Sequence, residues 1–220
     1  MSAMFIDRRD AGRRLAAALS GLKADRPIVY GLPRGGVPVA AEVAAVLGAP
    51  LDIVLVRKIG APGQPELAMG AVVDGETPEI FWNDDIVAAC GVSESARDAA
   101  AAAELRVIET RRRRYGQIPD RPSPKGRTAI VVDDGLATGA TAIVALHALR
   151  RMGAARVILA VPVGPPETVE RLRAVADEVV CLEEPQWFAG VGAFYEDFGQ
   201  TDDGEVIALM AEAARRSGKP

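Results

Sequence analysis

Two adjacent carboxylates, Asp133 and Asp134, end an apolar run in the stretch TAIVVDDGLATGAT, residues 128–141. Carboxylates at the end of a buried strand can accept hydrogen bonds from sugar hydroxyls. The loop that follows is built of small residues and threonines, so its main-chain N–H groups can come close to a phosphate. Its residues are Ala137, Thr138, Gly139, Ala140 and Thr141. The pattern predicts a binding site for a sugar phosphate.

Two other interpretations of this stretch are a tight turn with a solvated acid pair and a strand of the Walker B type. The Walker B interpretation requires a Gly-x-x-x-x-Gly-Lys-Ser/Thr partner, and the sequence contains none. It also contains no Gly-x-Gly-x-x-Gly loop of the kind that binds dinucleotides.

Arginine and glycine occur together in a second loop, YGLPRGGVP, residues 30–38. Arg34 offers a planar cation that suits bidentate contact with a phosphate, and Gly35 and Gly36 open a helical pattern. The combination predicts a cradle for a diphosphate. A glycine-rich turn with an exposed arginine is the alternative.

A third loop follows two basic residues, Arg57 and Lys58, which are predicted to end a strand over residues 51–58. The stretch LVRKIGAPGQPELAMG, residues 55–70, contains several glycines and prolines and little that could pack. Glu66 is its one acid, and it could serve as a general acid or base if the loop closes over a site. A solvated strand end and a surface glutamate are the alternatives.

Aromatic residues gather near the C-terminal end of the chain, where a flat heterocycle could stack on them. The candidates are Trp187, Phe188, Phe194 and Tyr195, and the alternative is ordinary packing. Four arginines at 111–114 lie at the end of a predicted helix and indicate a solvated face or an oligomer contact. A nucleic-acid patch is the other interpretation of the arginines, but a net charge of −4 argues against a general nucleic-acid binder.

The stretch VVDDGLATGAT, residues 131–141, resembles the phosphoribosyl pyrophosphate (PRPP) loop of the type I phosphoribosyltransferases. The resemblance implies that Asp133 and Asp134 hold the ribose 2′- and 3′-hydroxyls and that residues 137–141 wrap the 5′-phosphate. Gly135 departs from the pattern, since an aliphatic residue is usual there. Ala137 stands where hypoxanthine-guanine enzymes carry an aspartate, as in adenine and uracil enzymes, which argues against a 6-oxopurine mechanism of that kind.

The same resemblance gives the other loops their expected roles. Residues 30–38 resemble the pyrophosphate loop, so Arg34, Gly35 and Gly36, with Arg57 and Lys58, would hold the diphosphate. The 55–70 loop would close as a lid, and residues 186–198 would form the hood that binds the acceptor. Magnesium would enter with PRPP, bound by substrate oxygens and not directly by protein side chains.

The resemblance implies an enzyme of nucleotide metabolism, a glycosyltransferase that moves the 5-phosphoribosyl group from PRPP to a nucleobase-like or other nitrogen acceptor and releases pyrophosphate. One alternative is a PRPP-sensing regulator of the same fold that binds nucleic acid without turnover. Another is a hydrolase-like use of the same pocket. The sequence names neither the acceptor nor the assembly, for which a homodimer is one option.

Positioning these loops requires strands that alternate with helices. Short apolar runs at 27–32, 51–58, 67–74, 128–132, 155–163 and 178–182 predict strands, and a hairpin extension of the third is one option for 78–83. Helices are predicted after Asp7, over 37–48, 93–115, 141–152 and 166–176, and at the C-terminus. Apolar strands in this alternation predict an α/β, Rossmann-like parallel sheet flanked by helices. The resemblance implies the strand order 3-2-1-4-5.

A single domain accommodates this plan. We expect a core over residues 1–182 with an insertion at about 74–126, and a hood segment with a terminal helix over 183–220. The 220 residues are 49% hydrophobic, enough for a substantial core. The two cysteines, Cys90 and Cys181, indicate neither a disulfide framework nor a zinc site. No apolar run is long enough to span a membrane and no signal peptide is recognisable, so a cytoplasmic location is expected.

Overall fold

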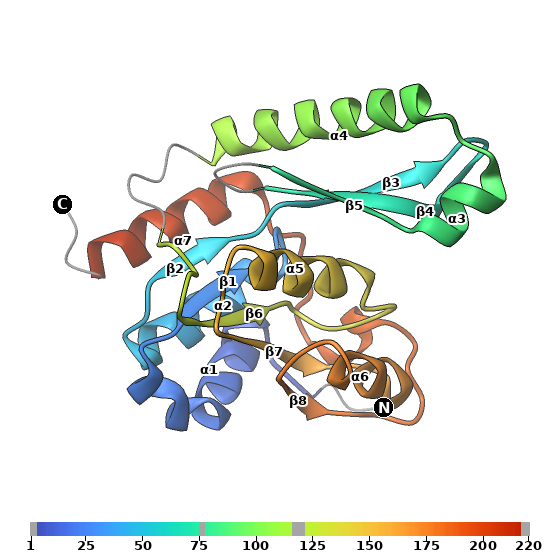
Figure 1. Ribbon diagram of the computed structural model, residues 1–220. Helices are drawn as coiled ribbons and strands as arrows, with labels where there is room; N and C mark the ends of the chain where they lie inside the picture. Colours follow the sequence, from blue (N-terminus) through green and yellow to red (C-terminus); the bar gives the residue numbers. More distant parts are fainter. Residues whose placement is uncertain (1–3, 75–77, 116–121, 217–220) are drawn as a thin grey trace. The chain divides into compact units, whose positions relative to one another are not determined.

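The computed structural model describes residues 4–74, 78–115 and 122–216, with only the backbone at 65 and 66 (Figure 1). The chain divides into two compact units. The first consists of Met1–Ile53 and Ile118–Pro220, and the second of Val54–Gln117. The sequence predicted a shorter insertion, 74–126, inside a larger core.

A five-stranded parallel sheet forms the centre of the first unit. Its strands are β1 (Ile28–Gly31), β2 (Leu51–Ile53), β6 (Thr128–Val132), β7 (Arg156–Val163) and β8 (Glu178–Glu183), in the order β2-β1-β6-β7-β8. Val29 pairs with Leu51 on one side and with Ile130 on the other. Every residue of β1 and β6 is buried, because helices cover both faces of the sheet. The predicted α/β class is confirmed.

The predicted strand order is wrong at one edge. Numbered along the chain, the five parallel strands run 2-1-3-4-5, whereas the sequence predicted 3-2-1-4-5. The predicted third strand, 67–74, lies in the antiparallel sheet of the second unit. Among the described residues the parallel sheet therefore ends at β2 on one side, and the later strands β6, β7 and β8 extend it on the other side of β1. The predicted strand 51–58 is also two strands, because the backbone leaves the β conformation at residues 54 and 55.

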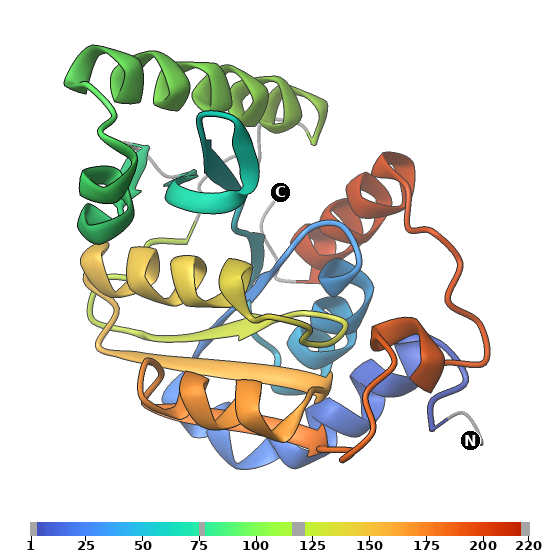
Figure 2. The same cartoon turned by 90° about the vertical axis from the view of Figure 1, so that its right-hand side faces the viewer.

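Helices cover the sheet in two groups. The first group is α1 (Arg8–Ala18), α2 (Gly36–Leu47) and α7 (Asp203–Arg216); α1 and α7 both pack on α2. The second is α5 (Ala140–Arg151) and α6 (Pro166–Arg173), which pack on β6, β7 and β8. Figure 2 shows α5 and α6 on one face of the sheet and α1 behind it. Short 3₁₀ helices occupy Ser20–Asp25 and Val191–Phe194.

Local sequence signals explain where these helices begin and end. The Asp7 side chain accepts a hydrogen bond from the Asp10 N–H at 2.7 Å and caps α1, as predicted. Gly48 follows α2 with φ +62°, the left-handed conformation that closes a helix. Helix α1 therefore starts at a fixed point, which sets the position of its first residue, Arg8.

The second unit is an antiparallel sheet with two helices. Its strands are β3 (Val56–Ala61), β4 (Gln64–Val73) and β5 (Glu79–Trp82), in that order. Its helices are α3 (Asp84–Cys90) and α4 (Glu94–Arg114). Ala101 and Ile108, seven residues apart, are buried on the side of α4 that packs against β3 and β4. No helix among the described residues is long and apolar enough to cross a membrane.

The loop predicted between the strands 51–58 and 67–74 is a β-hairpin. Strands β3 and β4 are joined by a turn at Pro62 and Gly63, and Gly63 has φ +75°. Of the residues that suggested an open loop, only Pro62 and Gly63 form the turn; Gly60 lies in β3, where the pairing with β4 is irregular, and residue 65 lies in β4. Arg57 and Lys58 consequently lie inside β3, not at a strand end.

Candidate active site

The acid pair lies at the carboxyl end of β6, at the centre of the parallel sheet. Asp133 and Asp134 are half-buried, and the Asp134 N–H donates to Asp133 Oδ1 at 2.9 Å. Burial, together with the negative charge of Asp134, raises the pKa of Asp133 well above its usual value.

The arginine–glycine loop lies directly on this acid pair. A Cβ placed on Gly35 would lie 2.0 Å from Asp134 Oδ2, and one on Gly36 would lie 2.6 Å from the Val132 carbonyl oxygen. Only glycine fits at either position, because no side chain could occupy that space. Arg34, before the two glycines, is half-buried, and the peptide bond between Pro33 and Arg34 is cis. The structure therefore brings two of the three predicted loops together.

The predicted phosphate loop leads from the acid pair into α5. Gly139 is the residue before the helix, with φ +72° and no side chain to cap the first turn. The Ala140 N–H, the first of α5, makes a long hydrogen bond of 3.4 Å to the Thr138 hydroxyl, and Gly139 itself offers no cap to the N–H groups that follow, so this turn is suited to an anion. Ala137, Thr138, Ala140 and Thr141 are exposed, as contact with a ligand requires.

Helix α6 holds the phosphate loop in shape. The Thr168 hydroxyl donates to the Ala137 carbonyl at 3.0 Å, and Arg171 Nη2 donates to the Thr138 carbonyl at the same distance. Because both hydrogen bonds go to carbonyl oxygens of the loop, they stabilise its conformation before any ligand binds. Nothing in the sequence pattern indicated this support.

Gly135, the departure from the family pattern, is explained by the hood. A Cβ on Gly135 would lie 2.5 Å from Val191 Cγ1, because the 3₁₀ helix at Val191–Phe194 packs onto the loop at this point. Val191 fills the space that an aliphatic residue at 135 would otherwise occupy. The glycine at position 135 is thus explained by packing against Val191.

Arg8 is the site residue that sequence reasoning missed. Its Nε donates to Asp134 Oδ2 at 2.7 Å, and the two side chains are only 12% and 15% exposed. The two residues are 126 positions apart, and nothing local to Arg8 indicates a partner. The Tyr195 hydroxyl, also unforeseen in this role, donates to the Asp134 carbonyl oxygen at 2.6 Å.

The hood aromatics divide into buried and exposed residues. Phe194 and Tyr195 are buried in a cluster with Phe5, whose ring centroid lies 5.4 Å from that of Tyr195. Burial raises the pKa of the Tyr195 hydroxyl. Phe188 stacks on Phe194 at 5.3 Å, whereas Trp187 is 81% exposed. Trp187 therefore keeps a free ring face, and the others chiefly shape the hood.

A polar pocket of about 230 Å³ lies beside Arg8. Its walls are the first turn of α1, Pro38 of α2 and residues 197–205. Both acids, including Asp7 and Glu205, and bases, including Arg9, line it. The pocket is large enough for a small heterocycle and borders the arginine that holds Asp134.

The residues predicted for the lid lie in the second unit. Arg57 Nε pairs with Glu104 at 2.8 Å, Lys58 is exposed on β3, and Glu66 belongs to β4 with its side chain outside the described residues. Their roles in contacting a diphosphate or in acid–base chemistry stay predictions from the family resemblance.

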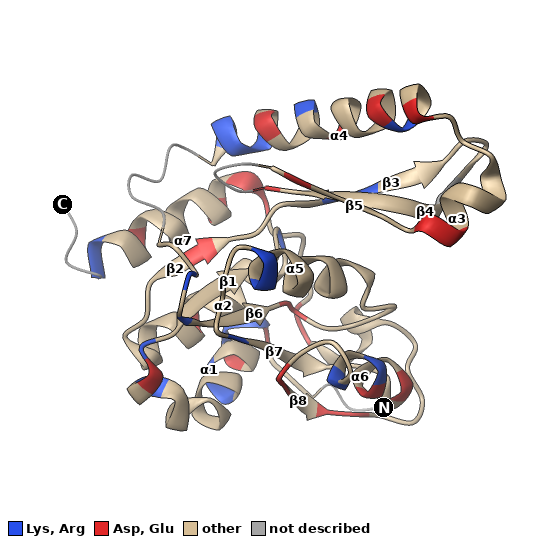
Figure 3. Ribbon diagram, in the orientation of Figure 1, with Lys and Arg blue, Asp and Glu red and all other residues tan. Residues whose placement is uncertain are grey.

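The four arginines at the end of α4 differ in their surroundings, and Figure 3 shows them gathered at that end of the helix. Arg112 pairs with Asp74 at 3.0 Å, and the Asp74 side chain is 1% exposed. Arg113 and Glu109, 3.7 Å apart, are both well exposed. Arg112 therefore neutralises a buried carboxylate and does not only face solvent.

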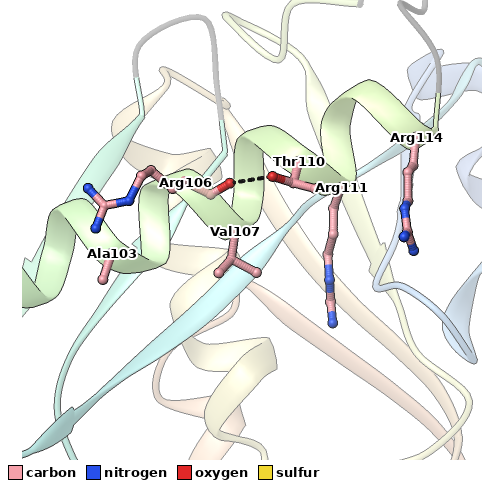
Figure 4. Close-up of a pocket in the computed structure, with 6 residues that line it drawn as sticks. All are labelled: Ala103, Arg106, Val107, Thr110, Arg111 and Arg114. Atoms are coloured by element: carbon pink, nitrogen blue, oxygen red, sulfur yellow. Dashed lines mark hydrogen bonds between the residues drawn. The ribbon is translucent and has the colours of Figure 1, made fainter.

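Arg111 and Arg114 line a shallow pocket of about 420 Å³ on the side of α4 opposite Ala101 and Ile108. Figure 4 shows these two side chains extending in the same direction, whereas Arg106 extends along the helix. The remaining lining residues are Ala103, Val107 and Thr110. All six belong to one helix of the second unit.

The described residues contain no group of three or more His, Cys, Asp or Glu side chains that could hold a metal ion. Asp133 and Asp134 offer two carboxyl groups, and one of them is already paired with Arg8. Such a site suits a magnesium ion that keeps most of its ligands from a diphosphate and from water.

A family model described as "Phosphoribosyl transferase domain" matches residues 7–198. The Mycobacterium tuberculosis protein named "Putative phosphoribosyl transferase Rv0571c" is 49% identical over 212 residues, which are 96% of this chain and 47% of that protein. The chain thus spans about half the length of the curated relatives it matches. A "Uracil phosphoribosyltransferase" of Bradyrhizobium diazoefficiens is 35% identical over 97 residues, 44% of this chain and 42% of that protein.

Among solved structures, the crystal structure of TT1426 from Thermus thermophilus resembles this chain with a TM-score of 0.85. The two sequences are 48% identical, and the match covers 94% of this chain and 98% of that one. The parallel sheet with its flanking helices is therefore a fold shared with a solved relative.

Proposed function

This chain belongs to the phosphoribosyl transferase domain family, and on that premise we propose that it transfers the 5-phosphoribosyl group of PRPP to a nitrogen acceptor and releases pyrophosphate. The observation that carries the proposal is the contact between the glycine loop and the acid pair. A loop suited to a diphosphate and carboxylates suited to a ribose lie so close that Gly35 can bear no side chain. One molecule that contains both groups, such as PRPP, fits this arrangement.

Each part of the site has a task in this reaction. Asp133 and Asp134 hold the ribose hydroxyls beside the positive charge that develops at C1′. The N–H groups at the start of α5, with Thr138 and Thr141, hold the 5′-phosphate. Arg34 and the Gly35 N–H hold the departing diphosphate, whereas the Gly36 N–H is bonded to the Leu32 carbonyl at 3.0 Å and helps to shape the loop. The acceptor nitrogen attacks C1′ from the side opposite to the leaving group, with inversion.

Magnesium, when bound with PRPP, neutralises charge on the departing diphosphate. Asp133 and Asp134 would act on the ion indirectly, because they hold the ribose that carries the diphosphate. Two further roles are predictions from the family resemblance alone. Arg57 and Lys58 would contact the diphosphate, and Glu66 would transfer a proton.

The acceptor is a flat nitrogen heterocycle in this proposal. Trp187 offers an exposed ring for stacking, and Phe188, Phe194 and Tyr195 shape the hood behind it. Ala137 leaves no acid at the position used by 6-oxopurine enzymes, and one partial relative is named a uracil phosphoribosyltransferase. Pyrimidines and adenine are therefore the first acceptors to test.

The test is pyrophosphate release from Mg–PRPP in the presence of uracil, adenine, xanthine, orotate and related heterocycles, one at a time. We expect release that depends on one acceptor or a small group of acceptors. A reaction without acceptor measures hydrolysis of PRPP, and the Asp134→Asn variant provides the inactive control. Failure of the protein to bind Mg–PRPP at all would overturn the proposal.

A further inference from the structure

An arginine from the far end of the chain binds one of the two carboxylates assigned to the ribose. Arg8 Nε donates to Asp134 Oδ2 at 2.7 Å, and the two side chains are only partly exposed, at 12% and 15%. An ion pair removed from water is favourable only when its geometry is good and its other hydrogen-bonding groups have partners. Arg8 has a second hydrogen bond and an aromatic contact that support this pair.

The Arg8 guanidinium is held from two further directions. Its Nη1 donates to the Gly199 carbonyl at 2.6 Å, and its plane lies over the Phe198 ring, 3.9 Å from the ring centroid. The Asp7 cap fixes the first turn of α1, from which Arg8 projects. These contacts do not involve Asp134, so Arg8 would keep its position if the Asp134 side chain moved.

Asp134 is fixed as firmly as its partner. Its carbonyl oxygen accepts the Tyr195 hydroxyl at 2.6 Å, and its N–H is bonded to Asp133 Oδ1. Oδ2 lies between the Arg8 guanidinium and the Cα of Gly35, where a Cβ would be only 2.0 Å away. Because Arg8 engages Oδ2, a sugar hydroxyl bound by Asp134 would have to contact Oδ1.

We infer that Arg8 is a positioning residue for ribose recognition, which keeps Asp134 oriented with Oδ1 toward the sugar and stays bonded to Oδ2 when PRPP binds. The inference rests on the proposed function, because it describes how that site holds its ribose. The opposite possibility is a gate, in which Arg8 occupies Asp134 only until the sugar displaces it. The contacts to Gly199 and Phe198 favour a fixed arginine over a displaceable one.

The first experiment measures the dissociation constant of Mg–PRPP by calorimetry for the wild type and the variants Arg8→Gln, Arg8→Lys and Arg13→Gln. Arg8→Gln removes a charged hydrogen bond to Asp134, so we expect affinity to fall about 10- to 100-fold. Arg8→Lys restores the positive charge but not the planar guanidinium that stacks on Phe198, so it should recover part of the loss. Arg13, on the same helix, has a side chain that is 56% exposed and lies 3.9 Å from Asp10; it is the matched control and should change affinity less than about twofold.

The outcomes separate this inference from the proposed function. If the wild type does not bind Mg–PRPP, the proposed function fails. If the wild type binds and Arg8→Gln binds equally well, Arg8 has no positioning role, even if the variant melts at a lower temperature. Once an acceptor is known, a positioning role also predicts a larger rise in KM for PRPP than fall in kcat.

A measurement on the unaltered protein covers the case in which the Arg8 variants do not fold. The Arg8 Nε–H resonance, assigned by correlation with its own backbone, should be protected from exchange with solvent in the free protein. We expect the same protection after saturation with Mg–PRPP. Loss of protection on saturation would show that the sugar displaces Arg8, and it would overturn the inference in favour of a gate.

Discussion

The two units of the chain use charge in different ways. In the first unit, Arg8 and Asp134 meet at the carboxyl end of a parallel sheet, in contact with a glycine loop and the hood. In the second unit, Arg112 and Asp74 join a helix to an antiparallel strand pair, with no cradle of glycines among the residues described. A buried ion pair alone does not mark a functional site; the convergence of several loops around it does.

The largest effect is expected from Asp134→Asn. This change removes the charge that pairs with Arg8 and leaves the guanidinium without its anion in a site shielded from water. We expect Mg–PRPP affinity to fall at least about 100-fold, measured by calorimetry. Asp25→Asn, at an exposed pair with Arg156 in the same unit, should leave affinity unchanged. Intact affinity in Asp134→Asn would show that the acid pair is not the ribose site.

The next effect concerns the glycine loop. In Gly35→Ala the new Cβ would collide with Asp134 Oδ2, so either the loop or the carboxylate must move. We expect about a tenfold loss of PRPP affinity and a decrease of about 1–3 kcal/mol in the free energy of unfolding. Gly21→Ala is the matched control, since a Cβ there meets nothing within 4 Å. Equal behaviour of the two variants would contradict the close contact on which the proposed function depends.

Within the second unit, neighbouring arginines should differ. Arg112→Gln weakens the contact with the buried Asp74 carboxylate, so the free energy of unfolding should fall by about 1–3 kcal/mol. Arg113→Gln removes only an exposed pair with Glu109 and should change stability by less than about 0.5 kcal/mol. Denaturant unfolding followed by far-ultraviolet circular dichroism measures both. Similar losses for the two variants would mean that the run acts as one charged surface.

The smallest effect is a pH dependence from Asp133. Its pKa is raised in the folded protein, so between its ordinary value of 3.8 and the raised value the folded state binds more protons than the unfolded state. Stability from this group is therefore complete below the ordinary pKa and is lost as pH rises toward the raised one. Asp133→Asn removes the titrating group, so its free energy of unfolding should lack this pH dependence. The free energies of unfolding of wild type and variant should therefore diverge by at most about 1.4 kcal/mol per pH unit. Urea unfolding at several pH values, from acidic to neutral, measures the difference; parallel curves would contradict the raised pKa.

Local composition was enough to predict much of the first unit. The apolar run before Asp133, the small residues after it and the glycines after Arg34 were enough to predict a strand and two tight loops, although α6 also supports the phosphate loop. The Asp7 cap and Gly48 likewise marked helix ends that the structure confirms. Because parallel strands place their carboxyl ends on one edge, the sequence also indicated that these loops would be neighbours.

The sequence could not predict contacts between distant segments. Arg8 is 126 residues from Asp134, and Phe5 joins Tyr195 across most of the chain. The run LDIVLV, at 51–56, contains no glycine or proline, and its one polar residue, Asp52, lies inside β2, so nothing marked the point where β2 ends and the second unit begins. Helix α3, in contrast, carried a visible signal that was missed: Asn83 caps it, and two aspartates follow.

The contact between Gly135 and Val191 limits how the chain could be recombined with its relatives. A chimera that imports a phosphate loop with an aliphatic residue at position 135 would drive a methyl group or more into Val191, 2.5 Å from the nearest carbon. The phosphate loop and the segment that carries Val191 are therefore matched in shape, and a chimera would have to import both together.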